Sequence, residues 1–296
     1  MKEISENTFC IVIDYEKNSC NPSRVFKTMT ELIETFQSLD IDLIKSIDNK
    51  IQPQLILEDI EIGSIKTIVS NILKSIDDEA IKNLEWQPVV GKYLVRAKYI
   101  IVDWLDGKIE ITDKNDIDDI KNRLLSLAEE TGVKKFPYYT PIESSDLING
   151  IDKINKSLKN LNPKDKATFI TKDEKTTFNL NLEFSPKQIE DLLTKETIVS
   201  KTVMILKVKK PDYLGDSKWE FKHDSHTIQA KIQHPEWIRQ FQSREIDIRP
   251  GDSIKARIST EVKYGFENEV INTNYNLIEV LDVLPLKDIS QQRLNI

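Results

Sequence analysis

The sequence predicts an α+β protein in which a small N-terminal α/β layer domain with several helices precedes a C-terminal five-stranded β-barrel. Apolar residues recur at helical spacing through much of the chain before residue 160, and they alternate with polar residues in short runs after residue 200. The chain is also poor in glycine, and its 8 glycines nowhere form a GxGxxG or GxxxxGK[ST] motif. Composition therefore excludes the glycine-rich phosphate cradles of Rossmann and P-loop proteins.

The first elements alternate strand and helix. Residues 8–15 form a continuous apolar run, which is typical of a strand covered on both faces. A helix begins at Asn21-Pro22, where proline suits the first turn, and its apolar spacing slips once near Asp40. A second strand covers residues 55–62. We expect a second helix after Ser64, with an apolar face formed by Ile65, Ile68, Val69, Ile72, Leu73 and Ile76.

Two more helical patterns complete the predicted N-terminal domain. One covers residues 89–105, and the other begins after Asp113 and ends at Thr131-Gly132, where glycine is a common C-terminal residue. The segment FPYYTP, residues 136–141, contains two prolines and cannot continue a helix. We therefore interpret it as a linker.

Residues 145–200 predict a helix, a β-hairpin and a short helix. The second arm of the hairpin alternates from Phe178 to Phe184, and Ser185-Pro186-Lys187-Gln188 has the pattern of a capping box. The predicted organisation is an α/β domain over residues 1–135, a linker and connecting subdomain over 136–200, a barrel domain over 201–285 and a tail over 286–296.

Five strands are predicted in the C-terminal region, with a short helix over residues 235–241 between the third and the fourth. The strands cover residues 202–209, 218–222, 227–232, 253–262 and 269–283. This order of three strands, one helix and two strands resembles that of the OB-type small barrel.

The barrel region differs from the rest of the chain in charge. The whole chain has 42 basic and 49 acidic residues, whereas residues 201–285 have 13 of each. Strand parity places five basic residues on the outside of the barrel, namely Lys207, Lys209, Lys231, Lys255 and Arg257. This basic stripe predicts a nucleic-acid-binding face as an alternative function. Trp219 and Phe221 share a face of their strand and either stack on bases or belong to the barrel core.

The segment PDYLGDSKWEFK resembles the PD-(D/E)xK signature of metal-dependent nucleases. The resemblance implies that Asp212 and Glu220 hold Mg²⁺ and that Lys222 steadies the developing charge. The competing interpretation is a charged hairpin, since the spacing is short for that signature. Nuclease activity is thus a second alternative, and Mg²⁺ is the only cofactor that any interpretation requires.

The remaining polar clusters predict no metal site. His223, His226 and His234 are interpreted as turn or surface histidines. Ser64, after Gly63, is interpreted as a helix N-cap, with anion binding as the alternative. Four acidic residues are interpreted as solubilising strand ends, with metal binding as the alternative: Asp14, Glu58, Asp59 and Glu61.

The helix over residues 89–105 carries a candidate partner-binding face. Lys92 and Arg96 lie one turn apart between Trp86 and Trp104, and aromatic and arginine residues dominate interface hot spots. The alternative is a core helix with a solvated edge. Gly91 falls inside this helical pattern, where glycine is unfavourable, and is therefore worth mutating first.

The chain has the features of a cytoplasmic protein without a membrane partner. Its two cysteines, Cys10 and Cys20, form no disulfide framework, and no uncharged apolar run is long enough to span a bilayer. The segments LEDIEIGSI and VVGKYLVRAKYIIVDWL resemble parts of uncharacterised bacterial proteins from accessory or phage-defence operons. Since no dense catalytic cluster is found, we expect a non-enzymatic interaction or regulatory protein that binds a protein partner or itself.

Overall fold

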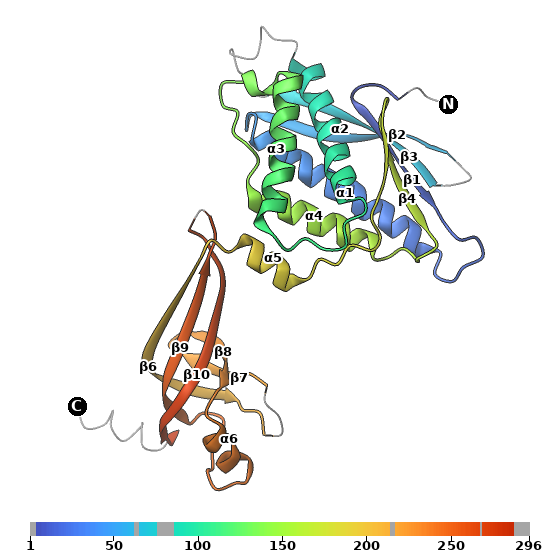
Figure 1. Ribbon diagram of the computed structural model, residues 1–296. Coiled ribbons are helices and arrows are strands. Elements are labelled where there is room, and N and C mark those ends of the chain that lie inside the picture. The colour runs from blue at the N-terminus through green and yellow to red at the C-terminus, as the bar shows by residue number, and fades with distance from the viewer. Residues whose placement is uncertain (1–3, 62–64, 76–85, 214–216, 267, 287–296) are drawn as a thin grey trace. The chain divides into compact units, whose positions relative to one another are not determined.

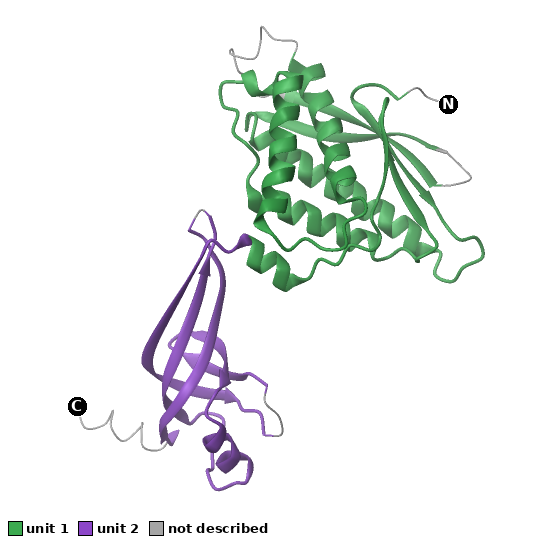
Figure 2. Cartoon of the chain, in the orientation of Figure 1, with its two compact units in different colours: residues 1–192 green, residues 193–296 purple. Residues whose placement is uncertain are grey.

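The computed structural model describes residues 4–61, 65–75, 86–213, 217–266 and 268–286. The chain divides into two compact units, residues 1–192 and residues 193–296 (Figure 2). The first unit contains an antiparallel sheet with helices, and the second contains a closed five-stranded barrel, so the predicted α+β class is confirmed.

The sheet of the first unit has the strand order β2-β3-β1-β4-β5, and all neighbouring strands are antiparallel. The strands are β1 (Thr8–Asp14), β2 (Ile51–Glu61), β3 (Ile65–Ser75), β4 (Lys166–Ile170) and β5 (Lys175–Thr177). The segment that follows residue 136 therefore contributes two strands to the same sheet as β1.

The predicted helix after Ser64 is wrong, because that segment forms strand β3. The strand lies between β2 and β1, and residues 67–71 are buried in succession. A strand covered on both faces does not alternate, so its apolar spacing matches a helix by coincidence. The β-branched residues Ile65, Thr67, Ile68 and Val69 suit a strand. Gly63 and Ser64 lie outside the described residues, and no helix follows them.

Four long helices accompany the sheet (Figure 1). They are α1 (Ser23–Lys45), α2 (Trp86–Leu105), α3 (Lys114–Thr131) and α4 (Ser144–Leu158). The Asp113 side chain accepts a hydrogen bond from the Asn115 N–H at the start of α3, and Gly132 adopts a left-handed conformation at its end, as predicted. A short 3₁₀ turn, η1 (Val133–Lys135), follows α3. In the predicted linker, the Thr140 N–H donates to Ser46 O at 2.7 Å.

Four phenylalanines form the centre of the first core. Phe9 on β1 stacks on Phe169 of β4 with ring centroids 5.2 Å apart, and Phe36 of α1 meets both rings edge-on. Phe178, which follows β5, completes the cluster. The face of β1 that carries Phe9 is therefore the face covered by α1.

The predicted second hairpin arm is only partly correct. The strand is β5, and the chain leaves the sheet after Phe178, whose N–H still donates to Ala167 O of β4, although Phe178, Leu182 and Phe184 remain buried. The Asn179 side chain donates to Leu105 O and Lys108 O, which directs the chain toward the end of α2. The next element is helix α5 (Pro186–Leu193). Its capping box is confirmed, since the Ser185 N–H donates to Gln188 Oε1 at 2.7 Å and the Gln188 N–H donates to Ser185 Oγ at 3.3 Å.

The slip in the apolar spacing of α1 has a structural reason. Asp40 of α1 is fully buried and forms an ion pair with Lys98 of α2, which is also fully buried. The Lys98 ammonium lies 5.1 Å from the centre of the Phe9 ring. Burial raises the pKa of Asp40 to about 6 and lowers that of Lys98, while the attraction between the two opposes both shifts.

A second buried ion pair joins three segments of the first unit. Asp165, just before β4, accepts two hydrogen bonds from the Arg24 guanidinium, each 3.0 Å long. Its two oxygens also accept from the backbone N–H groups of Glu16 and Asn162, each at 2.8 Å. Burial raises the pKa of Asp165, but these four donors outweigh it, so the pKa is lowered.

The second unit is a closed barrel with the strand order β10-β8-β7-β6-β9. Its elements are β6 (Glu196–Lys210), β7 (Trp219–His223), β8 (His226–Ile232), α6 (Pro235–Gln242), β9 (Ser253–Tyr264) and β10 (Val270–Leu284). Strands β8 and β10 pair in parallel, and the other pairs are antiparallel. All five predicted strands and the helix between the third and fourth are confirmed.

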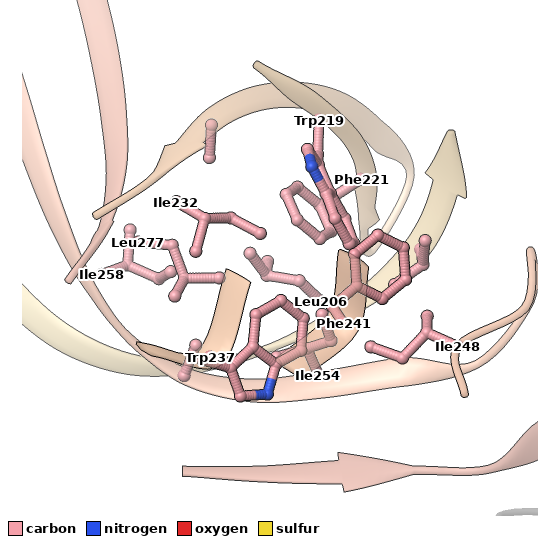
Figure 3. Close-up of a cluster of buried hydrophobic side chains, with 13 residues drawn as sticks. Leu206, Trp219, Phe221, Ile232, Trp237, Phe241, Ile248, Ile254, Ile258 and Leu277 are labelled. Atoms are coloured by element: carbon pink, nitrogen blue, oxygen red, sulfur yellow. The ribbon is translucent and has the colours of Figure 1, made fainter. Parts of the chain in front are cut away.

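The barrel core is built around aromatic side chains from strand β7 and helix α6 (Figure 3). The Trp219 ring lies 4.7 Å from that of Phe241 and 5.8 Å from that of Trp237, measured between centroids. Both α6 rings are buried, so α6 contributes directly to the interior of the barrel.

Three barrel strands extend beyond the closed part (Figure 1). Strand β6 pairs with β9 over residues 196–207, but with β7 only from Lys207 onward. Strand β10 pairs with β8 only over residues 275–277. Residues 196–206 of β6 therefore form one edge of a three-stranded extension, which we call the β6 edge.

The Asp40–Lys98 pair predicts a large, pH-dependent effect of Lys98→Met. Removing the lysine leaves a buried carboxylate without its cation, which should lower the free energy of unfolding by about 3–5 kcal/mol. An acid whose pKa is raised on folding favours the folded state at low pH. The loss should therefore be smaller at pH 5 than at pH 8. Urea unfolding followed by circular dichroism measures both.

Lys134→Met is the matched control, since Lys134 pairs with Glu129 and the side chains of both residues are about half exposed. We expect it to change the unfolding free energy by less than about 0.5 kcal/mol. Equal effects of the two substitutions would contradict the importance of the buried pair. The double variant Asp40→Leu with Lys98→Met should recover much of the lost stability.

For Asp165 we predict a pH dependence opposite to that of Asp40: its contribution to the free energy of unfolding is lost in acid. Because the pKa of Asp165 is lowered below its ordinary value of 3.8, its contribution is present above that pH and is lost as the pH falls below it. Asp165→Asn should destabilise the chain at pH 7, and its deficit relative to the natural chain should shrink below about pH 4. Urea midpoints measured from pH 7 to pH 3 test this, and a pH-independent deficit would contradict it.

Candidate functional site

The outer surface of the barrel carries a row of three lysines on adjacent strands. Lys207 of β6 lies directly opposite Lys222 of β7, and Lys255 of β9 lies opposite Ile205, two residues from Lys207. All three are exposed, and none of their side chains forms an ion pair or hydrogen bond with another described residue. We call Lys207, Lys222 and Lys255 the lysine row.

The other predicted basic residues of the barrel have partners. Lys209 lies 3.3 Å from a carboxylate oxygen of Glu220, and Arg257 lies 2.6 Å from one of Glu279. Lys231 is half-buried on β8 and also has a partner. The predicted basic face therefore contains unpaired lysines at β6 and β9, and the structure adds Lys222, which the sequence interpretation assigned to a nuclease site.

Trp219 and Phe221 do not stack on a ligand at the surface. Only 1% of Trp219 and none of Phe221 is exposed, because both point into the barrel, where α6 covers Trp219. Their proposed role in base stacking is therefore wrong, and the core interpretation is correct. The physical reason is that their shared face is the inward face of β7.

The three residues of the nuclease-like segment are engaged in separate contacts. The Asp212 carboxylate accepts from the Ser217 N–H at 3.0 Å, and Glu220 pairs with Lys209. Lys222 faces Lys207 across the β6–β7 pair. Within the described part of the chain, no group of three or more His, Cys, Asp or Glu side chains is arranged to hold a metal ion.

The histidines lie at the end of the β7–β8 hairpin and before α6. His223 and His226 are opposite each other, and His226 Nδ1 lies 3.1 Å from Ser225 Oγ. His234 Nδ1 accepts from the Val280 N–H at 3.2 Å, next to an irregularity in β10. His234 thus satisfies a backbone donor that the bulged strand leaves unpaired.

The acidic residues near the strand ends of the first unit are dispersed. Asp14 ends β1 opposite Lys166, and Asp59 follows a β-bulge in β2. The Glu58 carboxylate accepts from Ser70 Oγ, and Glu61 lies opposite Lys66.

The predicted partner face on α2 is divided between core and surface. Trp86 and Trp104 are buried, with 8% and 4% of their surfaces exposed, so they do not form a surface patch. Lys92 and Arg96 line a polar pocket of about 290 Å³ in the first unit. The two basic residues and the two tryptophans therefore do not act as one binding face.

Charged side chains that line the polar pocket form ion pairs with one another. Glu6 accepts from both Lys92, at 3.2 Å, and Lys172, at 3.0 Å, and these bonds lower the pKa of Glu6. Arg96 pairs with Glu130 and lowers the pKa of that carboxyl. The basic groups of the pocket are thus neutralised by the protein itself.

Gly91, which precedes Lys92, permits a close approach of the N-terminal segment to α2. A Cβ atom at this position would lie 2.7 Å from Asn7 Oδ1. The glycine inside the helical pattern therefore has a packing reason.

The β6 edge is a candidate functional surface that sequence reasoning missed. Four of its apolar side chains are about half exposed: Ile198 at 48%, Val199 at 57%, Val203 at 52% and Ile205 at 54%. The sequence contains one signal of this edge. Ile198 and Val199 are consecutive apolar residues, so both faces of the strand carry an apolar side chain. The predicted strand begins at residue 202, so it includes Val203 and Ile205 but not residues 196–201 of the edge.

Comparison with protein families, curated proteins and solved structures finds no match to this chain. Of the helices that the structure describes, none combines the length and apolar character needed to cross a membrane. Evidence about function therefore comes from the surfaces described above.

Proposed function

We propose that the chain is a non-enzymatic interaction or regulatory protein that binds an extended segment of a protein partner along the β6 edge. The observation that supports this is an eleven-residue stretch of strand, residues 196–206, with β9 on one side and no strand on the other among the described residues. In an antiparallel pair, about half of such residues direct both main-chain groups to the open side. An added strand can satisfy them.

A second edge in the same molecule shows how an edge is normally protected. Strand β2 is also an edge strand, but it contains Pro53, a β-bulge between Leu57 and Asp59, and several acidic residues. These features discourage strand addition. The β6 edge has no proline, and the first irregularity in β6 comes later, between Val208 and Lys210.

The side chains of the β6 edge specify the partner's chemistry. Val199, Val203 and Ile205 alternate on the outer surface, and Lys201 lies between them. A complementary segment has apolar residues at alternate positions and an acidic residue opposite Lys201. Such a segment comes from another protein or from a second copy of this chain.

The biological setting that we propose is a bacterial accessory system, such as one that acts against phage. Its support is the resemblance of LEDIEIGSI and VVGKYLVRAKYIIVDWL to segments of proteins from such operons. Regulation through protein contacts fits an exposed docking edge.

Val203→Lys tests the β6 edge, because a second lysine within residues 196–206, beside Lys201, discourages pairing. Tagged full-length chain is purified from its host, and co-purifying proteins are quantified by mass spectrometry. We expect the partner to fall at least about tenfold with Val203→Lys, which corresponds to about 1.4 kcal/mol. If the partner is a second copy, light scattering should show a dimer of the 34.3 kDa chain that Val203→Lys converts to monomer.

Ile109→Lys is the matched control, since Ile109 is an apolar residue of the first unit with 75% of its surface exposed. It should leave partner recovery and mass unchanged. A monomeric chain whose co-purifying proteins are the same with and without Val203→Lys would contradict the proposal. Circular dichroism confirms that each variant is folded.

A further inference from the structure

The lysine row is a concentration of positive charge within a barrel region that is neutral as a whole. Its three cations lie on the adjacent strands β9, β6 and β7, and neighbouring strands are about 4.8 Å apart. The row therefore extends roughly 10 Å across the outer surface of the barrel.

The nearby acidic side chains have other partners. Glu220 pairs with Lys209, and Glu279 pairs with Arg257. Asp282 lies opposite Lys255 in the strand register, yet its Oδ1 accepts from the Val283 N–H at 2.8 Å. None of these three carboxylates forms an ion pair with a lysine of the row.

This arrangement is unfavourable for the isolated chain. Like charges directly opposite each other on antiparallel strands repel, as Lys207 and Lys222 do. An anion with several regularly spaced charges would remove this repulsion and release its own counterions. We propose that the lysine row binds the phosphate backbone of a nucleic acid.

The neighbouring side chains favour backbone contacts over base recognition. The outward positions of β6, β7 and β9 contain no Phe, Tyr or Trp among the described residues, and the rings of Trp219 and Phe221 are inside the barrel. Lysine acts as a point charge toward phosphate, without the bidentate geometry that arginine offers to guanine. Binding should therefore depend on salt and be nearly independent of sequence.

This inference does not depend on the docking edge. Lys207 and Lys222 lie where β7 covers β6, and Lys255 lies opposite Ile205 at the end of the β6 edge, whereas Val203 lies further along the part of that edge that β7 leaves uncovered. Val203→Lys, which should weaken partner binding, should leave nucleic-acid binding intact. The two proposals can thus fail separately.

The experiment measures fluorescence anisotropy of a labelled oligothymidine of about 20 nucleotides, and of a duplex of equal length, with the full chain. We expect binding that weakens steeply between about 50 and 200 mM salt. Replacing all three lysines, as Lys207→Gln with Lys222→Gln and Lys255→Gln, should weaken binding at low salt at least about tenfold. It should also reduce the slope of log affinity against log salt by about 2–3.

A control with the same change in net charge uses Lys17→Gln, Lys135→Gln and Lys187→Gln, which alter exposed lysines of the first unit. It should bind as the natural chain does. The proposal is overturned if no binding occurs at about 50 mM salt, or if the row variant binds as well as the control. It is also overturned if the chain sediments with phosphatidylserine vesicles but does not bind either oligonucleotide. Urea unfolding verifies that the row variant retains its fold.

Discussion

Main-chain hydrogen bonding between strands is the constraint on which both units depend. A strand without a neighbour presents a row of unpaired N–H and C=O groups. In the barrel, most of these groups are paired because β6, β7, β8, β9 and β10 form a closed sheet. In the first unit, the edge strand β2 contains a proline and a β-bulge, which discourage pairing with a further strand. The β6 edge combines length, apolar side chains and an uninterrupted register, whereas β10, the other edge of the extension, has three irregularities in its pairing with β9. Its openness is the basis of the proposed docking function.

Two kinds of charged residue have distinct roles: buried ones that form ion pairs within the first unit, and exposed ones on the surface of the barrel. Asp165 is buried with four donors around it, and Lys98 is buried against Asp40 and the Phe9 ring. Such groups fix how helices and loops meet the sheet. The lysine row has the opposite character, since its cations are exposed and lack carboxylate partners in the described chain. An exposed lysine that has no carboxylate partner within the protein is available to an external anion. The absence of such partners therefore identifies this surface better than the net charge does.

Local sequence patterns predicted much of the fold but less of the candidate site. The capping box at Ser185 and the helix end at Gly132 depend on neighbours within a few residues, so the sequence contains their determinants. Strand parity correctly placed Lys207 and Lys255 outside the barrel. It placed Trp219 and Phe221 on one face, but only the closed barrel with α6 showed that this face is interior.

The sequence by itself determined where most strands and helices lie and which side chains share a face, because both follow from short-range periodicity. Only the tertiary structure decided that β3 is a central strand, since burial on both faces erases the alternation that marks a strand. It also decided that Lys207 meets Lys222 and that the β6 edge is open. These facts depend on register and strand order, which bring together residues that are distant in the chain.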